Sequence, residues 1–276
     1  MMRSVPHRDS VLCRHNGILR DYSMELTLSS YLIVCPLVFL ASFVDSIAGG
    51  GGLISLPAYL LAGIPIHFAI GSNKLSSATG TVISTARMVK NKYADMKLAP
   101  LSVAAALAGS FLGARTALNT GAEVLQMLLI IVLPFTAFYV LKNKNLEPEN
   151  PNSIKRSSQY AIVTAAALII GFYDGFYGPG AGTFLLLAFT GLAKMDLRTA
   201  SGNMKLVNLS SNVAAMVTYV AAGKIIWPLS LTAAVFSIAG HYIGSGMVMK
   251  NGTKIVKPII LGVLALLFIK VLSGLI

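Results

Sequence analysis

Two aspartates and two glycine clusters interrupt apolar runs and are the residues whose types and spacing first suggest chemistry. In "FVDSIAGGGGLISLP" Asp45 precedes four consecutive glycines, and in "FYDGFYGPGAGTFLLL" Asp174 precedes a Gly-Pro-Gly-Ala-Gly sequence. Glycine and proline are the poorest helix formers, so each cluster is expected to unwind a helix. The helix that restarts after each break begins with amides that have no partner, and such amides attract anions.

The two aspartates have two candidate roles. A carboxylate inside an apolar run is costly and often marks a pathway for ions or protons, so Asp45 and Asp174 could carry a coupling proton. They could equally have a structural role, which is to cap the backbone amides that the breaks expose. The sequence leaves both roles open.

Two lysines lie just inside other apolar segments, each on a stripe of polar residues at helical spacing. One stripe consists of Lys74, Ser77, Thr81 and Thr85, and the other of Ser201, Lys205, Asn208 and Asn212. Each set falls on one helix face. A cation among hydroxyls and amides suits a small oxoanion. The alternative is that each lysine lies near a helix end and extends to the membrane interface.

Together these features predict one anion site between the two breaks, with the lysines supplying charge. The predicted substrate-binding residues are Gly50, Gly51, Gly52, Asn73, Lys74, Ser77, Gly180, Gly182, Thr183, Asn203, Lys205, Asn208 and Asn212. Asn73 and Asn203 could instead cap unwound segments, and the glycine clusters could instead be packing contacts between helices. His241, alone in its span, is predicted to be a hydrogen-bonded packing residue.

The elements that position these residues are predicted to be membrane helices. The chain has 276 residues, of which 55% are hydrophobic and only 12% are charged, whereas a soluble protein carries about a quarter charged residues. Apolar runs of roughly 18 residues or more can cross a bilayer. We therefore expect an all-α, polytopic membrane protein. The full-length runs are 28–48, 69–89, 98–118, 123–141, 160–177, 200–222, 228–248 and 258–276, and two short runs are 53–62 and 183–192.

The net charge of +12 comes mostly from short loops between apolar runs. Basic loops of this kind anchor the cytoplasmic face of a membrane protein, so we expect no nucleic-acid partner. No catalytic constellation, metal-ligand spacing or nucleotide-binding motif is present, and we expect neither an enzyme nor a metal or cofactor. The expected partners are the lipid bilayer and a small anion, and a homo-oligomer is left open.

The two halves of the chain match each other in order. "GGGLISLPAYLLAG" (50–63) aligns with "GPGAGTFLLLAFTG" (178–191), "GSNKL" (71–75) with "GNMKL" (202–206), and "GSFLG" (109–113) with "GHYIG" (240–244). Such repeats are typical of secondary transporters. The predicted divisions are a polar and disordered N-terminal extension (1–23), transmembrane repeat 1 (24–141), a cytoplasmic linker (142–159) and transmembrane repeat 2 (160–276).

The loop charges predict that the repeats are inverted. The strongly basic loops 87–97 and 250–257 are placed in the cytoplasm. Each broken pair, 28–62 and 160–192, must then leave and re-enter on the same side, the first from outside and the second from inside. Each repeat therefore consists of a glycine-broken re-entrant helical hairpin and three full transmembrane helices.

The two segments "FVDSIAGGGGLISLPAYLLAGIPIHFAIGSNKLSS" and "GFYDGFYGPGAGTFLLLAFTGL…ASGNMKLVNLSSN" resemble the two repeat signatures of the sulfite exporter TauE/SafE family. That family is also called the toluene sulfonate uptake permease (TSUP) family. The likeness covers nearly all of the chain from about residue 28. It implies a multi-pass plasma-membrane transporter of prokaryotic type for sulfite, sulfoacetate or other small sulfur-containing anions, and it does not select one ligand.

We therefore expect a secondary transporter of small organosulfur anions or oxoanions. It would work by alternating access of its two inverted halves and would draw on the proton gradient. A passive anion channel could use the same site and remains an alternative. A membrane-embedded scaffold or enzyme is a third class, and the lack of a catalytic constellation speaks against the enzyme. The sequence leaves the direction of transport open.

Overall fold

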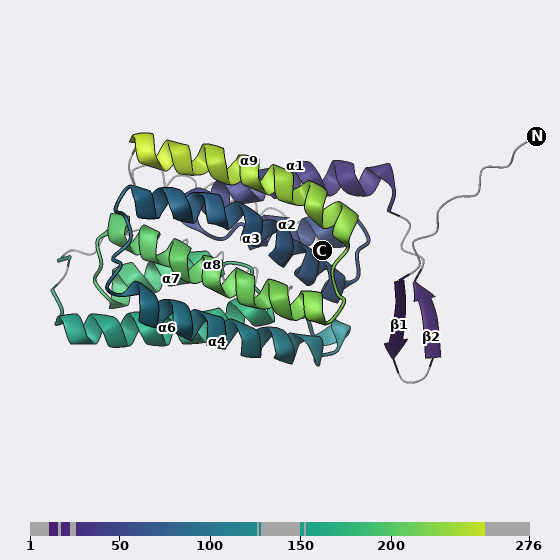
Figure 1. The fold of residues 1–276 in the computed structure, drawn as a ribbon, viewed down its shortest axis with the longest axis horizontal. Helices are drawn as coiled ribbons and strands as arrows, with labels where there is room; N and C mark the ends of the chain where they lie inside the picture. The colour runs from purple at the N-terminus through teal and green to yellow at the C-terminus, as the bar shows by residue number, and fades with distance from the viewer. Residues whose placement is uncertain are drawn as a thin grey trace, which may run out of the picture.

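The computed structural model describes residues 11–15, 18–22, 26–125, 127, 150–151 and 153–251, which form a helical bundle with a small β-hairpin beside it (Figure 1). The helices are α1 (Leu28–Ala48), α2 (Gly52–Leu61), α3 (Ile66–Lys90), α4 (Ala99–Leu118), α6 (Arg156–Phe176), α7 (Ala181–Leu187) with its π-helical continuation η1 (Ala188–Leu192), α8 (Leu197–Ala221) and α9 (Trp227–Asn251). The prediction of an all-α membrane fold is confirmed. Each predicted run inside the described residues is helical, with ends displaced by a few residues.

Several predicted segments lie wholly or mostly outside the described residues. They are the spans 123–141 and 258–276 and the boundary of the N-terminal extension at Met24; the linker 142–159 is described at 150–151 and 153–159, and its last four residues belong to α6. The described part of that extension, which was expected to lack structure, forms two antiparallel strands, β1 (Val11–His15) and β2 (Ile18–Tyr22).

The helices divide into an inner pair and outer pairs. Helices α1, α4, α6 and α9 are long and apolar enough to cross a membrane. Helices α3 and α8 have 25 residues each, which is roughly 37 Å of helix, but they carry the two polar stripes. They pack against each other in the middle of the bundle, with α1 and α9 on one side and α4 and α6 on the other (Figure 1). The polar stripes are therefore held inside protein, away from lipid.

The packing has the symmetry of an inverted repeat. Helix α1 packs against α9 as its equivalent α6 packs against α4, and α3 packs against α9 as α8 packs against α4. In Figure 1 the hairpin of α1 and α2 opens toward the right end of the bundle, while the hairpin of α6 and α7 opens toward the left end. The described helices thus have the two inverted halves of the fold prediction.

Glycines allow the outer helices to pack closely. A Cβ atom at Gly113 of α4 would meet the backbone carbonyl of Phe172 on α6, and one at Gly240 of α9 would meet the carbonyl of Phe39 on α1. Small residues are the usual means by which membrane helices approach each other. The matched "GSFLG" and "GHYIG" motifs therefore form equivalent packing contacts in the two halves.

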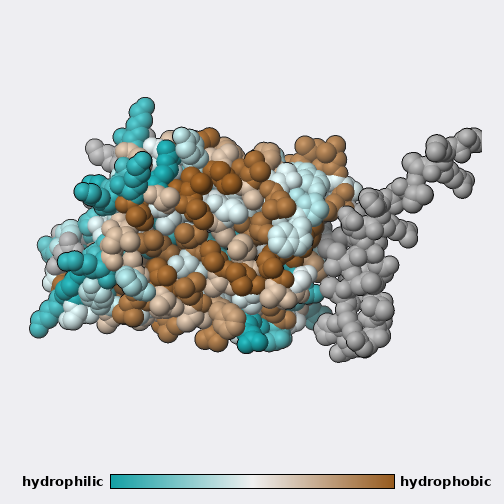
Figure 2. Space-filling view, viewed as in Figure 1, coloured by the Kyte–Doolittle hydropathy of each residue, from teal (hydrophilic) through white to brown (hydrophobic). Residues whose placement is uncertain are grey.

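The surface separates into an apolar middle and a basic end. Figure 2 shows apolar residues over the middle of this face and hydrophilic residues gathered at the left end. That end holds the last turns of α3 and α9 and the first turns of α4, α6 and α8. Its basic residues are Lys90, Lys92, Lys97, Lys155, Arg156, Lys194, Arg198 and Lys250. The cytoplasmic placement of this end stays a prediction from the positive-inside rule.

Candidate functional site

Each hairpin tip is a short turn built from left-handed glycines. After α1 ends, Gly49 and Gly50 have φ of +73° and +89°, and after α6 ends, Gly178 and Gly180 have φ of +102° and +84°. Side chains with a Cβ atom rarely adopt this conformation, so the glycines allow the chain to reverse and start a second helix. Both clusters break a helix, as the sequence predicts.

The two tips pack directly against each other. A Cβ atom at Gly49 would lie 2.6 Å from the carbonyl carbon of Gly182, and one at Gly52 would lie 3.2 Å from the Cα atom of Pro179. Breaks that are far apart in the sequence therefore meet inside the bundle. This juxtaposition is what an anion site built from both halves requires.

A cavity of about 30 Å³ lies beside the tips. At about 10–15 Å³ for each water molecule, it has room for two or three waters. Its wall comes from both halves and consists of Ala41, Ser42, Asp45, Gly50, Gly51, Gly52, Ser55, Asn73, Lys74, Ser77, Asp174, Gly178, Ala181, Gly182, Asn208, Asn212 and His241. The amides of Gly50 and Gly182 donate hydrogen bonds to no other described residue, so these donors are free to serve a solute.

The structure brings most of the predicted site residues to this cavity, including both aspartates. Four predicted residues do not line it. Gly180 is the N-cap of α7, Thr183 is packed beside the first tip, and the Asn203 amide donates to a backbone carbonyl one turn earlier in α8. Lys205 donates to Asp45, which lines the cavity in its place. Which residues bind an anion stays a prediction.

Each lysine forms a buried ion pair with the aspartate of the opposite half. Lys74 Nζ donates to Asp174 Oδ1 at 2.8 Å and to Asn212 Oδ1 at 3.0 Å. Lys205 Nζ donates to Asp45 Oδ2 at 2.7 Å and also to the Asp45 backbone carbonyl. The lysine side chains are 3% and 0% exposed, so neither extends to the membrane interface. The sequence assigned both lysines to the anion and named no partner for them, whereas the structure pairs each with a carboxylate.

The aspartates also satisfy neighbouring hydrogen-bond donors. Asp45 Oδ1 accepts from the amide of Gly51 at 3.1 Å, so this carboxylate caps the first break. Asp174 Oδ2 accepts from the hydroxyl of Ser211. The structural role that the sequence left open is present at Asp45, in addition to the ion pair with Lys205.

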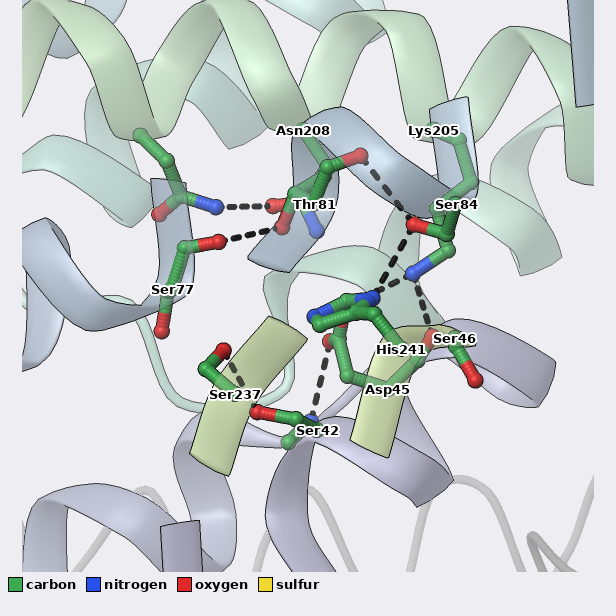
Figure 3. A network of polar contacts seen from close by, with 12 residues as sticks. Ser42, Asp45, Ser46, Ser77, Thr81, Ser84, Lys205, Asn208, Ser237 and His241 are labelled. Atoms are coloured by element: carbon green, nitrogen blue, oxygen red, sulfur yellow. Dashed lines mark hydrogen bonds and ion pairs between the residues drawn. The ribbon is translucent and has the colours of Figure 1, made fainter. Parts of the chain in front are cut away.

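His241 on α9 is buried and hydrogen-bonded, as the sequence predicts, and it also belongs to the cavity wall. Figure 3 shows its ring beside Asp45, Lys205 and Ser84. The Nε2 atom is 3.8 Å from Asp45 Oδ2, and the Nδ1 atom is 3.0 Å from Ser84 Oγ. Beside it, a 2.8 Å hydrogen bond between two serines joins α1 to α9. His241 is thus the one titratable side chain of the described cavity wall outside the two ion pairs.

The position equivalent to His241 in repeat 1 has no histidine. Applying the repeat alignment, His241 corresponds to Ser110, and Gly80 corresponds to Ser211. A Cβ atom at Gly80 would collide with the imidazole, so Gly80 provides the space that the ring needs. This mismatch between otherwise matched halves was the sequence signal that could have identified His241 as a site residue.

Comparisons with known proteins agree with this architecture. Residues 34–271 match the family model described as sulfite exporter TauE/SafE. The chain is 33% identical over 254 residues to the probable membrane transporter protein YfcA of Escherichia coli (strain K12), covering 89% of this chain and 94% of that one. It is 34% identical over 236 residues to the probable membrane transporter protein ORF9 of Sinorhizobium sp, covering 85% and 89%. No solved structure matches.

Proposed function

Because the chain belongs to the sulfite exporter TauE/SafE family of membrane transporters, we propose that it is a secondary transporter of small organosulfur anions or oxoanions. The anions would be of the sulfite and sulfonate type, and the membrane would be the plasma membrane. The observation that supports this most is the cavity between two hairpin tips of opposite direction. Transporters with inverted repeats place their substrate site at such a junction.

The cavity wall has the donors that an oxoanion needs. Backbone amides of Gly50 and Gly182 come from the two tips, and amide side chains of Asn73 and Asn208 come from the two polar stripes. Ser77 adds a hydroxyl whose hydrogen bond to a described residue is long, at 3.5 Å. Amides and hydroxyls at close range replace the water that a small anion loses on entering the protein.

The size of the cavity favours a carrier over an open channel. Space for two or three waters is about the size of one small anion such as sulfite, so the cavity would hold a single solute between the two halves. Lys74–Asp174 and Lys205–Asp45 each join a polar-stripe helix of one half to the hairpin of the other. These ion pairs would break and re-form during alternating access, with the proton gradient as the source of energy.

A ligand screen tests the proposed site. Purified protein is heated with sulfite, sulfate, thiosulfate, sulfoacetate or taurine, because a ligand that binds only the native state raises its apparent stability. For an anion that binds, Ser77→Ala should weaken affinity by about 10- to 100-fold, since a hydrogen bond to a charged group contributes about 1.5–3 kcal/mol. The control is Ser102→Ala, which removes a buried hydroxyl of α4 that bonds only within its own helix.

Two results would contradict the proposal. One is that no anion of the panel raises the stability or enters proteoliposomes. The other is that Ser77→Ala and Ser102→Ala have the same effect on affinity. Counterflow of labelled anion against unlabelled anion separates the two transport classes, because a carrier shows it and a passive channel does not.

A further inference from the structure

The hydrogen bonds around His241 favour one tautomer of its neutral ring. Ser84 has one hydroxyl hydrogen, and it donates that hydrogen to the backbone carbonyl of Thr81 at 3.1 Å. We assign the hydrogen of the neutral ring to Nδ1, because the Ser84 oxygen, which donates to Thr81, then accepts from Nδ1 at 3.0 Å. The Nε2 atom is then bare, and its lone pair lies 3.8 Å from a carboxylate oxygen of Asp45.

Two proton acceptors that face each other in a buried site, here His241 Nε2 and Asp45 Oδ2, can share a bound proton. Adding a proton from water to Nε2 creates an imidazolium that forms an ion pair with Asp45 Oδ2, 3.8 Å away. His241 is 1% exposed, so the new charge would be held by protein groups and not by bulk solvent. Asp45 would then be the counter-ion of both Lys205 and the imidazolium.

The charge balance of the site supplies a reason for that proton. Lys74 and Lys205 are matched by Asp45 and Asp174, so the four charges sum to zero. A monovalent anion entering the cavity would leave an uncompensated buried negative charge, which is expensive in a medium of low polarity. A proton on His241, which lines the same cavity, restores neutrality.

We infer that His241 takes up one proton for each monovalent anion that enters the cavity, so that anion and proton bind as a neutral pair. This inference rests on the proposed function and deepens it, because it assigns the coupling proton to one residue. The equivalent of His241 in the other half is Ser110, so only one half carries the proton. Coupling of the proton to the anion is therefore asymmetric, although the two halves of the fold are related by two-fold pseudosymmetry.

Few other groups around His241 could take up the coupling proton. Helix α1 presents Asp45 to the ring, α8 presents Lys205, and α3 presents Ser84. The charged residue of α3 one turn further, Arg87, instead bonds to the Tyr242 carbonyl and to a serine of α9. Across the cavity, the aspartate and lysine of the second ion pair neutralise each other.

The test measures proton uptake on anion binding. Methanesulfonate is the probe because it stays monovalent at every working pH, and a pH indicator reports protons taken from a weakly buffered detergent solution. We expect about one proton per bound anion, and an affinity that falls by about tenfold for each pH unit above the midpoint of the histidine. His241→Gln should bind with an affinity that does not depend on pH and should take up no proton.

The matched control is His67→Gln. His67 lies on α3, where its ring contacts the backbone carbonyls of Ala117 and Thr120, and it does not line the cavity. This variant should behave as the unaltered protein does. A second measurement uses the unaltered protein labelled with ¹⁵N-histidine, in which the NMR signal of Nε2 should change from bare to protonated when methanesulfonate is added. That signal decides the matter even if His241→Gln does not fold.

Failure of this inference can be told from failure of the proposed function. If methanesulfonate binds without proton uptake, if His241→Gln still takes up a proton, or if Nε2 stays bare with anion bound, the assignment to His241 is wrong while anion transport stands. If neither methanesulfonate nor any anion of the earlier panel binds or is transported, the proposed function is wrong and this inference falls with it.

Discussion

Removing one partner of the Lys74–Asp174 pair should destabilise the protein more than removing both. The two side chains are 3% and 5% exposed and their charged atoms are 2.8 Å apart. Lys74→Met leaves the Asp174 carboxylate buried with the hydroxyl of Ser211 as its remaining described side-chain donor. A buried charge that loses its partner costs about 3–5 kcal/mol, so we expect a loss of that size in the free energy of unfolding.

The double variant supplies the decisive comparison. Lys74→Met with Asp174→Asn replaces the pair by a neutral amide that can still accept from Ser211, so its loss should be about 2 kcal/mol or less. The coupling between the two sites, taken from the double-mutant cycle, should then be at least about 2 kcal/mol. That corresponds to roughly a 30-fold change in the ratio of folded to unfolded protein.

The assay is unfolding in mixed micelles, with increasing sodium dodecyl sulfate in a mild detergent and helix content followed by circular dichroism. The unaltered protein, both single variants and the double variant are compared under identical conditions. Additive losses, or single variants as stable as the unaltered protein, would refute the conclusion that this pair is a buried, mutually dependent unit. The same outcome would remove the reason for regarding the site as charge-balanced.

Two further predictions concern the tip and the basic end. Gly49→Ala should abolish anion uptake, because its Cβ would lie 2.6 Å from the carbonyl carbon of Gly182 and its φ is +73°. The control, Gly121→Ala, has open space around it and should leave uptake unchanged. Equal uptake by the two variants would contradict the packing of the tips. Burial raises the pKa of Asp95, but its hydrogen bonds to Arg156 and to the amides of Lys97 and Leu98, together with the charge of Arg156, outweigh this and lower the pKa below 3.8. The pair should therefore contribute up to about 1 kcal/mol above pH 3.8 and lose it as the pH falls through the lowered pKa. Asp95→Asn should remove this pH dependence of stability, and an unchanged profile in that variant would show that the pair contributes nothing.

The fold could be read from the sequence because its signals are local. Hydropathy runs located the helices, and the clusters at Gly49 and Gly178 located the breaks, since glycine and proline act on the chain at their own positions. Matched motifs gave the repeat, and loop charge gave its inversion. None of these inferences needed to know which side chains touch.

The details of the site depend on contacts between distant segments, and the sequence could not supply them. Nothing in the stripe around Lys74 indicates that its partner is Asp174, 100 positions further on. The two lysines were therefore assigned to the anion without their carboxylate partners, and His241 was not among the predicted site residues. Which face of α7 lines the cavity depends on how the second tip packs against the first. The sequence does not show this packing, so Gly180 and Thr183 were predicted to bind substrate although they do not line the cavity.

The crossed ion pairs have a consequence for biogenesis. The first half of the chain is synthesised with a lysine and an aspartate whose counter-charges have not yet been made, and both are expensive to leave in hydrocarbon. Lys74 has no counter-charge until Asp174 has been synthesised, and Asp45 has none until Lys205 has been synthesised. The nascent first half must therefore wait in a hydrated or chaperoned state, and a truncated chain that stops at the linker should be cleared by quality-control proteases.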